Sequence, residues 1–176
     1  MRNKEHDGLG MLGKSYRVPI YPLRPGDFTA PDSWFKVFTQ QPVRSMVITP
    51  PRCSTVYSRT IDLSGKAWSG AGDVVRVDVS SDNGATWLET SLAPAPNTYA
   101  WQEWEISITL PTIGVWTVYV RATDHTGAVQ PMLVPSWNPG GYGNNQASKL
   151  DIEVASPSQR GTVRSSQTEK QAPCWL

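Results

Sequence analysis

Three aspartates have the residue type that acid–base catalysis or calcium binding requires: Asp78, Asp82 and Asp124. Asp78 lies within an alternating apolar run, so it is expected on the outward side of a strand. Asp82 opens an Asp-Asn-Gly turn, and Asp124 begins the segment 124–127, Asp-His-Thr-Gly, which is typical of a hairpin connection. Because these are ordinary places for aspartate, we expect the three carboxylates to be structural.

Other candidates for catalysis or ligand binding are few. No serine lies in a Gly-x-Ser-x-Gly motif, and the glycines of 65–72 lack the Gly-Lys-Ser/Thr triplet of a phosphate loop. His6, His125 and the two cysteines are too few and too scattered for a zinc site. Cys53 and Cys174 are far apart in sequence, so we expect two free thiols and no disulfide. The sequence therefore predicts no catalytic, cofactor-binding or metal-binding residue.

Composition limits the partners that the chain could have. The formal net charge is +1 and no Lys/Arg cluster occurs, which argues against nucleic-acid binding. No apolar run approaches the roughly 20 residues of a membrane-spanning helix, and the first residues lack the apolar run of a signal peptide. We therefore expect a soluble chain with neither a nucleic-acid nor a membrane partner, in an unknown compartment. Eight tryptophans predict either an indole-rich core or a surface that a partner covers.

Short apolar runs at regular spacing, separated by Gly, Pro and Asn, dominate the middle of the chain. The clearest is 74–80, where Val75, Val77 and Val79 alternate with polar residues, followed by the Asn83-Gly84 turn. No helical periodicity and no internal repeat is visible. The pattern predicts an all-β, immunoglobulin-like antiparallel β-sandwich of about seven strands. The expected strands are 43–49, 61–68, 74–80, 86–90, 101–109, 116–124 and 149–154.

Alternation also predicts which tryptophans are buried. In 101–109, Trp104, Ile106 and Ile108 share the apolar face with Gln102, whereas Trp101 lies on the other face. We expect Trp87 and Trp104 in the core and Trp101 and Trp116 on the outside. Trp137 lies in a loop rich in glycine, amides and aromatics, 135–145, which is either a well-packed connection or a contact surface.

The chain divides into three predicted parts. Residues 1–39 are dense in proline and glycine and are expected to form an arm or linker. Residues 40–156 hold nearly all the β-like pattern and form the predicted domain. Residues 157–176 are polar and are expected to be a disordered, flexible tail.

Several short motifs follow one another along the chain: Gly65-Lys66-Ala67-Trp68-Ser69-Gly70, Val75-Arg76-Val77-Asp78-Val79-Ser80, Asp82-Asn83-Gly84-x-Thr86-Trp87, Trp101-x-x-Trp104, Arg121-Ala122-x-Asp124-x-x-Gly127-x-x-Gln130-Pro131, Trp137-Asn138 and Asn144-Asn145. In this order and spacing they resemble the carboxyl-terminal dimerisation domain of the sulfite oxidase family of molybdenum oxidoreductases, which nitrate reductase shares. The resemblance covers roughly residues 40–155, and the arm is similar to the segment that leaves the molybdenum domain in that family. The pattern around 138–142 looks like that of bacterial-type sulfite or sulfane dehydrogenases, and Gly140 stands where some sulfite oxidases have an arginine.

The resemblance implies a non-catalytic assembly module. Its partners would be a second copy, giving a homodimer, and a molybdopterin-binding catalytic domain or subunit that is absent from this chain and holds the molybdenum cofactor. Outward Trp101 and Trp116 would anchor the contact, with Arg121 at its rim. The loop would add further dimer or domain contacts, from Trp137, Asn138, Tyr142, Asn144 and Asn145.

An alternative from a different class stays open at this point. The chain could be a free-standing immunoglobulin-like binding module, with Trp137, Tyr142 and Asn145 forming a surface for a glycan or a peptide. Substrate, electron acceptor and dimer geometry do not follow from the sequence.

Overall fold

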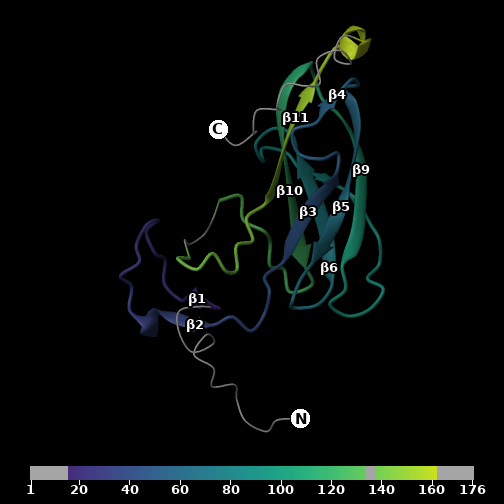
Figure 1. The fold of residues 1–176 in the computed structure, drawn as a ribbon. Coiled ribbons are helices and arrows are strands. Elements are labelled where there is room, and N and C mark those ends of the chain that lie inside the picture. The colour runs from purple at the N-terminus through teal and green to yellow at the C-terminus, as the bar shows by residue number, and fades with distance from the viewer. Residues whose placement is uncertain (1–15, 134–137, 162–176) are drawn as a thin grey trace.

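The computed structural model describes residues 16–133 and 138–161, and it consists of two packed β-sheets with a small third sheet at one end (Figure 1). The first large sheet has the order β4-β11-β10-β6-β7 and the second the order β3-β5-β9-β8. The predicted β-sandwich is therefore confirmed. Its strands are β3 (Arg44–Thr49), β4 (Thr55–Val56), β5 (Thr60–Trp68), β6 (Val74–Ser80), β7 (Leu88–Glu89), β8 (Ser91–Leu92), β9 (Gln102–Thr109), β10 (Gly114–Asp124) and β11 (Ser148–Val154).

Six of the seven predicted strands agree with the structure to within two residues at each end, and the seventh is not a single strand. The predicted strand 86–90 is instead divided into β7, which pairs with β6, and β8, which pairs with β9. Thr90 lies between them, is buried, and donates its backbone N–H to Val77 O at 3.0 Å. The chain therefore crosses from one sheet to the other at this residue, which a continuous alternating pattern does not reveal.

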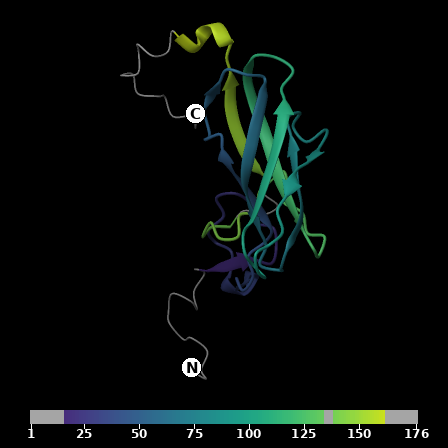
Figure 2. The same ribbon diagram turned by 90° about the vertical axis from the view of Figure 1, so that its right-hand side faces the viewer.

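The predicted arm has local structure of its own. β1 (Arg17–Pro19) and β2 (Phe35–Val37) form an antiparallel pair, and the 3-10 helix η1 (Asp32–Trp34) lies just before β2. Leu23, Ala30 and Phe35 form a small buried cluster. A second 3-10 helix, η2 (Pro157–Gly161), follows β11, where the sequence predicted a flexible tail. Figures 1 and 2 place β1 and β2 at one end of the sandwich and η2 at the other.

The core lies between the two large sheets and is built from the inward residues of every long strand. Trp104 is 1% exposed and lies in it, as the alternation of 101–109 predicted. Its indole fits because Gly65, opposite on β5, has no side chain. A Cβ on Gly65 would lie 2.5 Å from Trp104 Cζ2 and closer still to the carbonyl oxygen of Met46. The core therefore accepts this indole only with glycine at position 65.

A bulge changes the predicted alternation in β6. Thr123 pairs with Arg76 but Asp124 pairs with Val74, so the register shifts and Val75 has no partner across the strands. Val75 is 56% exposed, whereas Val74 is buried. The predicted alternation of Val75, Val77 and Val79 is therefore broken at Val75.

Two buried glutamines join the sheets across the core. Gln102 on β9 accepts from Val74 N at 2.7 Å and donates to Val74 O and Ala93 O. Gln130 accepts from Ser45 N at 2.7 Å and from Ala122 N at 2.9 Å, which links β3 to β10. Each amide satisfies backbone groups that would otherwise be buried without partners, so these side chains define the edges of the sandwich.

Candidate interaction surfaces

The outer face of the five-stranded sheet contains a buried carboxylate. Asp78 points outward from β6, as predicted, yet it is only 1% exposed. Arg76 Nε donates to its Oδ1 at 2.6 Å and Arg121 Nε to its Oδ2 at 3.3 Å. Glu89 of β7 lies directly across from Asp78 and is 3.6 Å from Arg76 Nε. One buried acid therefore holds two guanidinium groups in place on the surface.

Trp87 covers this cluster and does not lie in the core, so that expectation is wrong. The guanidinium carbon of Arg121 lies 3.9 Å from the centroid of the Trp87 ring, a cation–π contact. The reason is the route of the chain. After the turn at Asn83-Gly84, where both residues have positive φ, the chain returns beside β6 as the edge strand β7, and the Trp87 ring just before it contacts Arg121 on the outer face. An indole next to a strand can thus be placed outside the sheet.

The turn before Trp87 is stabilised by Asp82. Thr86 donates its side-chain O–H and its backbone N–H to this carboxylate, at 2.6 and 2.9 Å, and Ser80 Oγ donates at 2.7 Å. Those hydrogen bonds lower the pKa of Asp82 to about 2. The structural role predicted for Asp82 is confirmed.

Asp124 organises the turn that follows β10, again as predicted. Its Oδ1 accepts from the Thr126 backbone N–H and hydroxyl, and its Oδ2 from Ser69 Oγ at 2.8 Å. Burial acts to raise the pKa of Asp124, but hydrogen bonds from Thr126, Ser69 and Ala128 together outweigh it and hold the pKa below its usual value. A carboxylate with this many donors closes a turn and is not free to act as a general base.

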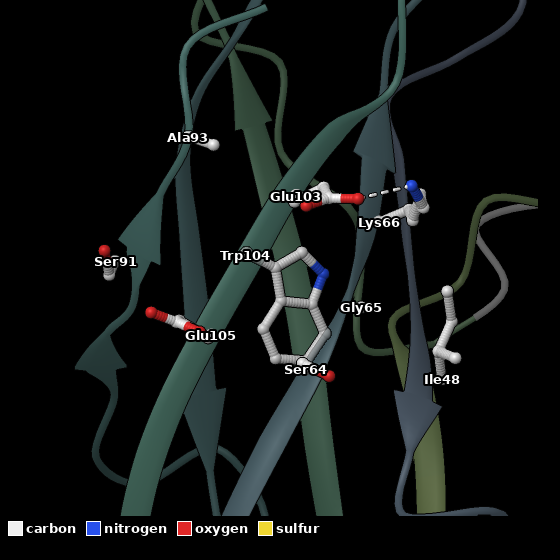
Figure 3. Close-up of a pocket in the computed structure, with 9 residues that line it drawn as sticks. All are labelled: Ile48, Ser64, Gly65, Lys66, Ser91, Ala93, Glu103, Trp104 and Glu105. Atoms are coloured by element: carbon white, nitrogen blue, oxygen red, sulfur yellow. Dashed lines mark hydrogen bonds and ion pairs between the residues drawn. The ribbon is translucent and has the colours of Figure 1, made fainter.

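The outer face of the four-stranded sheet is open and hollowed. A hollow of about 490 Å³ lies over β5 and β9, and a neighbouring one of about 440 Å³ continues along the same strands. Figure 3 shows Lys66 and Glu103 pointing toward each other, joined at 2.7 Å, with Trp104 between the two strands. The indole Nε1 of Trp104 is buried and has no acceptor among the described residues. Small side chains leave the space; the first hollow is lined by Ile48, Ser64, Gly65, Lys66, Ser91, Ala93, Glu103, Trp104 and Glu105.

Trp101 and Trp116, both predicted to face outward, have different environments. Trp101 is 57% exposed and stacks on Trp68, with ring centroids 5.3 Å apart. Trp116 packs against the core, on the same side of β10 as Val118, and its Nε1 donates to Thr112 O at 3.0 Å. The outward placement of Trp116 is therefore wrong, because in β10 the even-numbered residues, Trp116 among them, face the core.

The loop after residue 137 lies against the arm. Asn138 Nδ2 donates to Arg17 O at 3.0 Å and to Tyr142 O at 2.9 Å, and its Oδ1 accepts from Gly140 N. The Tyr142 ring is 4.9 Å from that of Tyr16. These contacts join β1 to the loop and leave the Asn138 amide fully occupied.

Asn144 and Asn145 connect the same loop to the sandwich through their backbone. Arg44 donates to Asn144 O at 2.9 Å, and Gln130 Nε2 donates to Asn145 O at 3.2 Å. Asn144 Oδ1 caps the following turn by accepting from Gln146 N. Trp137, the remaining residue of the predicted set, lies outside the described residues. The loop is a packed connection over the part that can be described.

Cys53 contradicts the expectation of a free thiol, because it is disulfide-bonded. The sequence has one other cysteine, Cys174, which lies outside the described residues. Sequence separation is a poor guide here, because disulfide formation depends on where the cysteines lie in the fold.

Residues 16–133 and 138–161 contain no group of three or more His, Cys, Asp or Glu side chains that could hold a metal ion. Over the same ranges, no helix has the length and apolar character needed to cross a membrane.

Comparison with known proteins identifies the sandwich. Residues 36–155 match the family model described as the Mo-co oxidoreductase dimerisation domain. The mitochondrial sulfite oxidase of Rattus norvegicus is 33% identical over 120 residues, which are 64% of this chain and 22% of that protein. Nitrate reductase [NADH] 1 of Oryza sativa subsp. japonica is 30% identical over 141 residues, 70% of this chain and 15% of that protein. The chain thus spans about a fifth or less of the length of these relatives.

A solved structure has the same fold. The sulfane dehydrogenase SoxCD from Paracoccus pantotrophus superposes with a TM-score of 0.57 at 22% identity, covering 83% of this chain and 39% of that one. At this identity the match supports the architecture, and the sequence matches support the family.

Proposed function

The chain belongs to the Mo-co oxidoreductase dimerisation domain family, and on that premise we propose that it pairs two subunits of a sulfite oxidase-type molybdenum oxidoreductase. The observation that carries the proposal is the family match over residues 36–155, which includes both large sheets of the sandwich. The domain division 1–39, 40–156 and 157–176 is part of the proposal.

The catalytic partner in this proposal is a molybdopterin-binding domain or subunit. The relatives that resemble this chain are named as sulfite oxidases and nitrate reductases, and the chain corresponds to 22% or less of their length. We assign the molybdenum cofactor and the oxidation or reduction of substrate to the remainder of such an enzyme. This chain would position that remainder and hold two copies of it together.

The arm is the surface that we assign to the catalytic partner. Phe28 is 66% exposed, and further apolar side chains of β1, β2 and their connection are also exposed. So many exposed aromatic groups in one short segment indicate a surface that another protein covers. The exposed set is Tyr16, Ile20, Tyr21, Phe28, Trp34 and Val37.

The loop contacts fit the same role. Asn138 and Tyr142 join the loop to β1, while the backbone of Asn144 and Asn145 joins it to the sandwich. We propose that these four residues set the angle between arm and sandwich, and hence the position of the catalytic domain. Trp101 lies near this end, since its partner Trp68 donates to Gln41 Oε1 just after the arm. We propose Trp101 as a second contact to that domain.

The free-standing binding module is the weaker proposal. It requires the loop to present free polar groups to a glycan or peptide, whereas the Asn138 amide and the Asn145 carbonyl are both used within the chain. Tyr142 is partly covered by Tyr16.

Sedimentation velocity of the full chain tests the assembly function. We expect a reversible monomer–dimer equilibrium between low and high micromolar concentration. A chain that stays monomeric at high micromolar concentration would contradict self-association. A gene encoding a molybdopterin domain next to the gene for this chain would support the catalytic partner independently.

A further inference from the structure

We propose that two copies of this chain pair through the outer face of the five-stranded sheet, with Tyr119, Arg121 and Trp87 at the centre of the contact. The proposal rests on the proposed function, because it assumes that the chain self-associates. It adds the face of the sandwich that forms the contact, which the family match does not identify. The outer face of the four-stranded sheet would then stay free in the dimer.

The charges on the five-stranded face are balanced in number, with carboxylates and cations interspersed. Arg121 lies across from Asp78, and Asp78 across from Glu89. On the other side of β10, Asp151 is bonded to Arg52 at 3.0 Å and lies 3.3 Å from Lys149. Because cations lie beside carboxylates on this face, two copies of it can meet without net repulsion. The charged set is Arg52, Arg76, Arg121 and Lys149 with Asp78, Glu89, Asp151 and Glu153.

The central side chains are of the types that anchor protein interfaces, and two of them are held in place. Arg121 is fixed by Asp78 below and Trp87 beside it, and its side chain is only 28% exposed. Among the described residues only its Nε is bonded, so its two amino groups remain available as donors. Arg76 is held by its Nε in the same way. Less side-chain entropy is lost when such a pre-ordered arginine binds, which favours the contact.

The same face has apolar area around the charges. Tyr119 lies between Ser80 and Lys149 in the middle of the sheet, two residues from Arg121. Val115, at the far end of β10, is 79% exposed, and Val75, beside the bulge, is 56% exposed. Their burial in a dimer would supply the hydrophobic part of the association free energy.

The outer face of the four-stranded sheet is a poor match for a copy of itself. It is hollow over β5 and β9, so two such faces would enclose empty space. Its carboxylates, Asp62, Glu103 and Glu105, outnumber its cations, Arg44 and Lys66. Glu105 lies between Ser64 and Ser91, and no described cation pairs with it. Self-pairing would therefore bring uncompensated carboxylates together.

Matched arginine substitutions distinguish the two faces. Tyr119→Arg places a long cation in the centre of the five-stranded face, and Ile48→Arg does the same on the other face, where Ile48 is 48% exposed. In sedimentation velocity on the full chain we expect Tyr119→Arg to raise the dimer dissociation constant at least about 100-fold and Ile48→Arg to leave it within about threefold. Circular dichroism and the melting temperature establish that each variant is folded.

A second variant tests the same face should Tyr119→Arg fail to fold. Val115→Arg changes a side chain that is almost fully exposed, so it should fold normally and still raise the dissociation constant at least about tenfold. Two outcomes would show that the assigned face is wrong while the proposed function stands. In the first, the wild type dimerises and only Ile48→Arg breaks the dimer. In the second, the wild type dimerises and none of the three variants breaks it. If the wild type never dimerises, both fall.

Discussion

The two large sheets have inner faces of the same kind but outer faces that differ. On the five-stranded sheet, Asp78 is shielded by Arg76, Arg121 and Trp87, although nothing in the alternating pattern distinguishes it from an exposed strand residue. On the four-stranded sheet, the corresponding outward residues Glu103 and Glu105 remain exposed beside a hollow. Alternation thus predicts the side of a residue, but what covers that side depends on segments that arrive from elsewhere.

The difference has a physical origin in the connection between β6 and β9. The segment 81–90 first returns beside β6 as the two-residue edge strand β7, and Trp87, just before that strand, contacts Arg121 on the outer face. It then crosses at Thr90 and reaches the other sheet only as the two-residue strand β8. Both sheets therefore gain a short edge strand, and the five-stranded sheet also gains an indole over Arg121.

Gly65→Ala would have the largest effect and would disrupt the four-stranded sheet. The added Cβ would approach the Met46 carbonyl and the Trp104 ring, and a backbone carbonyl in a paired strand cannot move aside cheaply. We expect a loss of about 3 kcal/mol in the free energy of unfolding. Chemical denaturation monitored by tryptophan fluorescence measures it. Ser64→Ala, on the outward side of the same strand, is the control and should stay close to wild type.

A comparison of Asp78→Ala with Glu103→Ala tests the ion pairs of the two outer faces directly. Asp78 is buried and leaves two arginines without their acceptor, so we expect a loss of about 2 kcal/mol. Glu103 is exposed and its bond to Lys66 is screened by water, so little change is expected. Equal losses in urea denaturation would mean that the covering by Trp87 has no energetic consequence.

Trp87→Ala should cost less than Asp78→Ala, because it removes the cover but not the acceptor. Loss of the cation–π contact and of part of the buried area predicts about 1 kcal/mol. Trp101→Ala is the matched change on the other face, where the indole is more exposed and stacks only on Trp68. Thermal melts of both variants should rank Trp87→Ala as the less stable, and the reverse order would contradict the comparison.

Acid titration should give the smallest effect, confined to the turn that carries Trp87. The pKa of Asp82 is about 2 in the folded protein, below its usual 3.8, so its stabilising contribution is complete above about pH 4 and is lost as the pH falls toward 2. The melting temperature of Asp82→Asn should therefore lie below that of the wild type at pH 5 and converge with it near pH 2.

Asp73→Asn is the control for that titration. Asp73 is exposed, and no described side chain donates a hydrogen bond to its carboxylate. At pH 5, Asp73→Asn should leave the melting temperature close to that of the wild type, because no hydrogen bond to its carboxylate is lost. If both variants behave alike, the Thr86 and Ser80 hydrogen bonds do not stabilise the turn.

Much of the fold could be predicted because strands and turns depend on local sequence. The alternation of Val77 and Val79 and the Asn83-Gly84 turn define β6 and its end without reference to the rest of the chain. The placement of Trp104 on the apolar face follows for the same reason. Family motifs then identified the class of domain, which the match over residues 36–155 confirms.

The interaction surfaces were less predictable because they join residues that are distant in sequence. Arg121 and Asp78 are 43 positions apart, and Gln130 and Ser45 are 85 apart. Trp87 and Trp116 were misassigned because the first depends on the route of a loop and the second on the exact phase of a strand. The two indoles are chemically identical, and only their neighbours in the fold determine where each one lies.

By itself, the sequence determined an all-β sandwich of one family, since period-two alternation and turn residues act within a few positions along the chain. Only the tertiary structure decided that Asp78 is shielded while Glu105 is open, that Cys53 is not a free thiol, and that Gln130 closes the edge between the sheets. Burial and hydrogen-bond partners are properties of the assembled layers, and no local pattern specifies which distant segment supplies them.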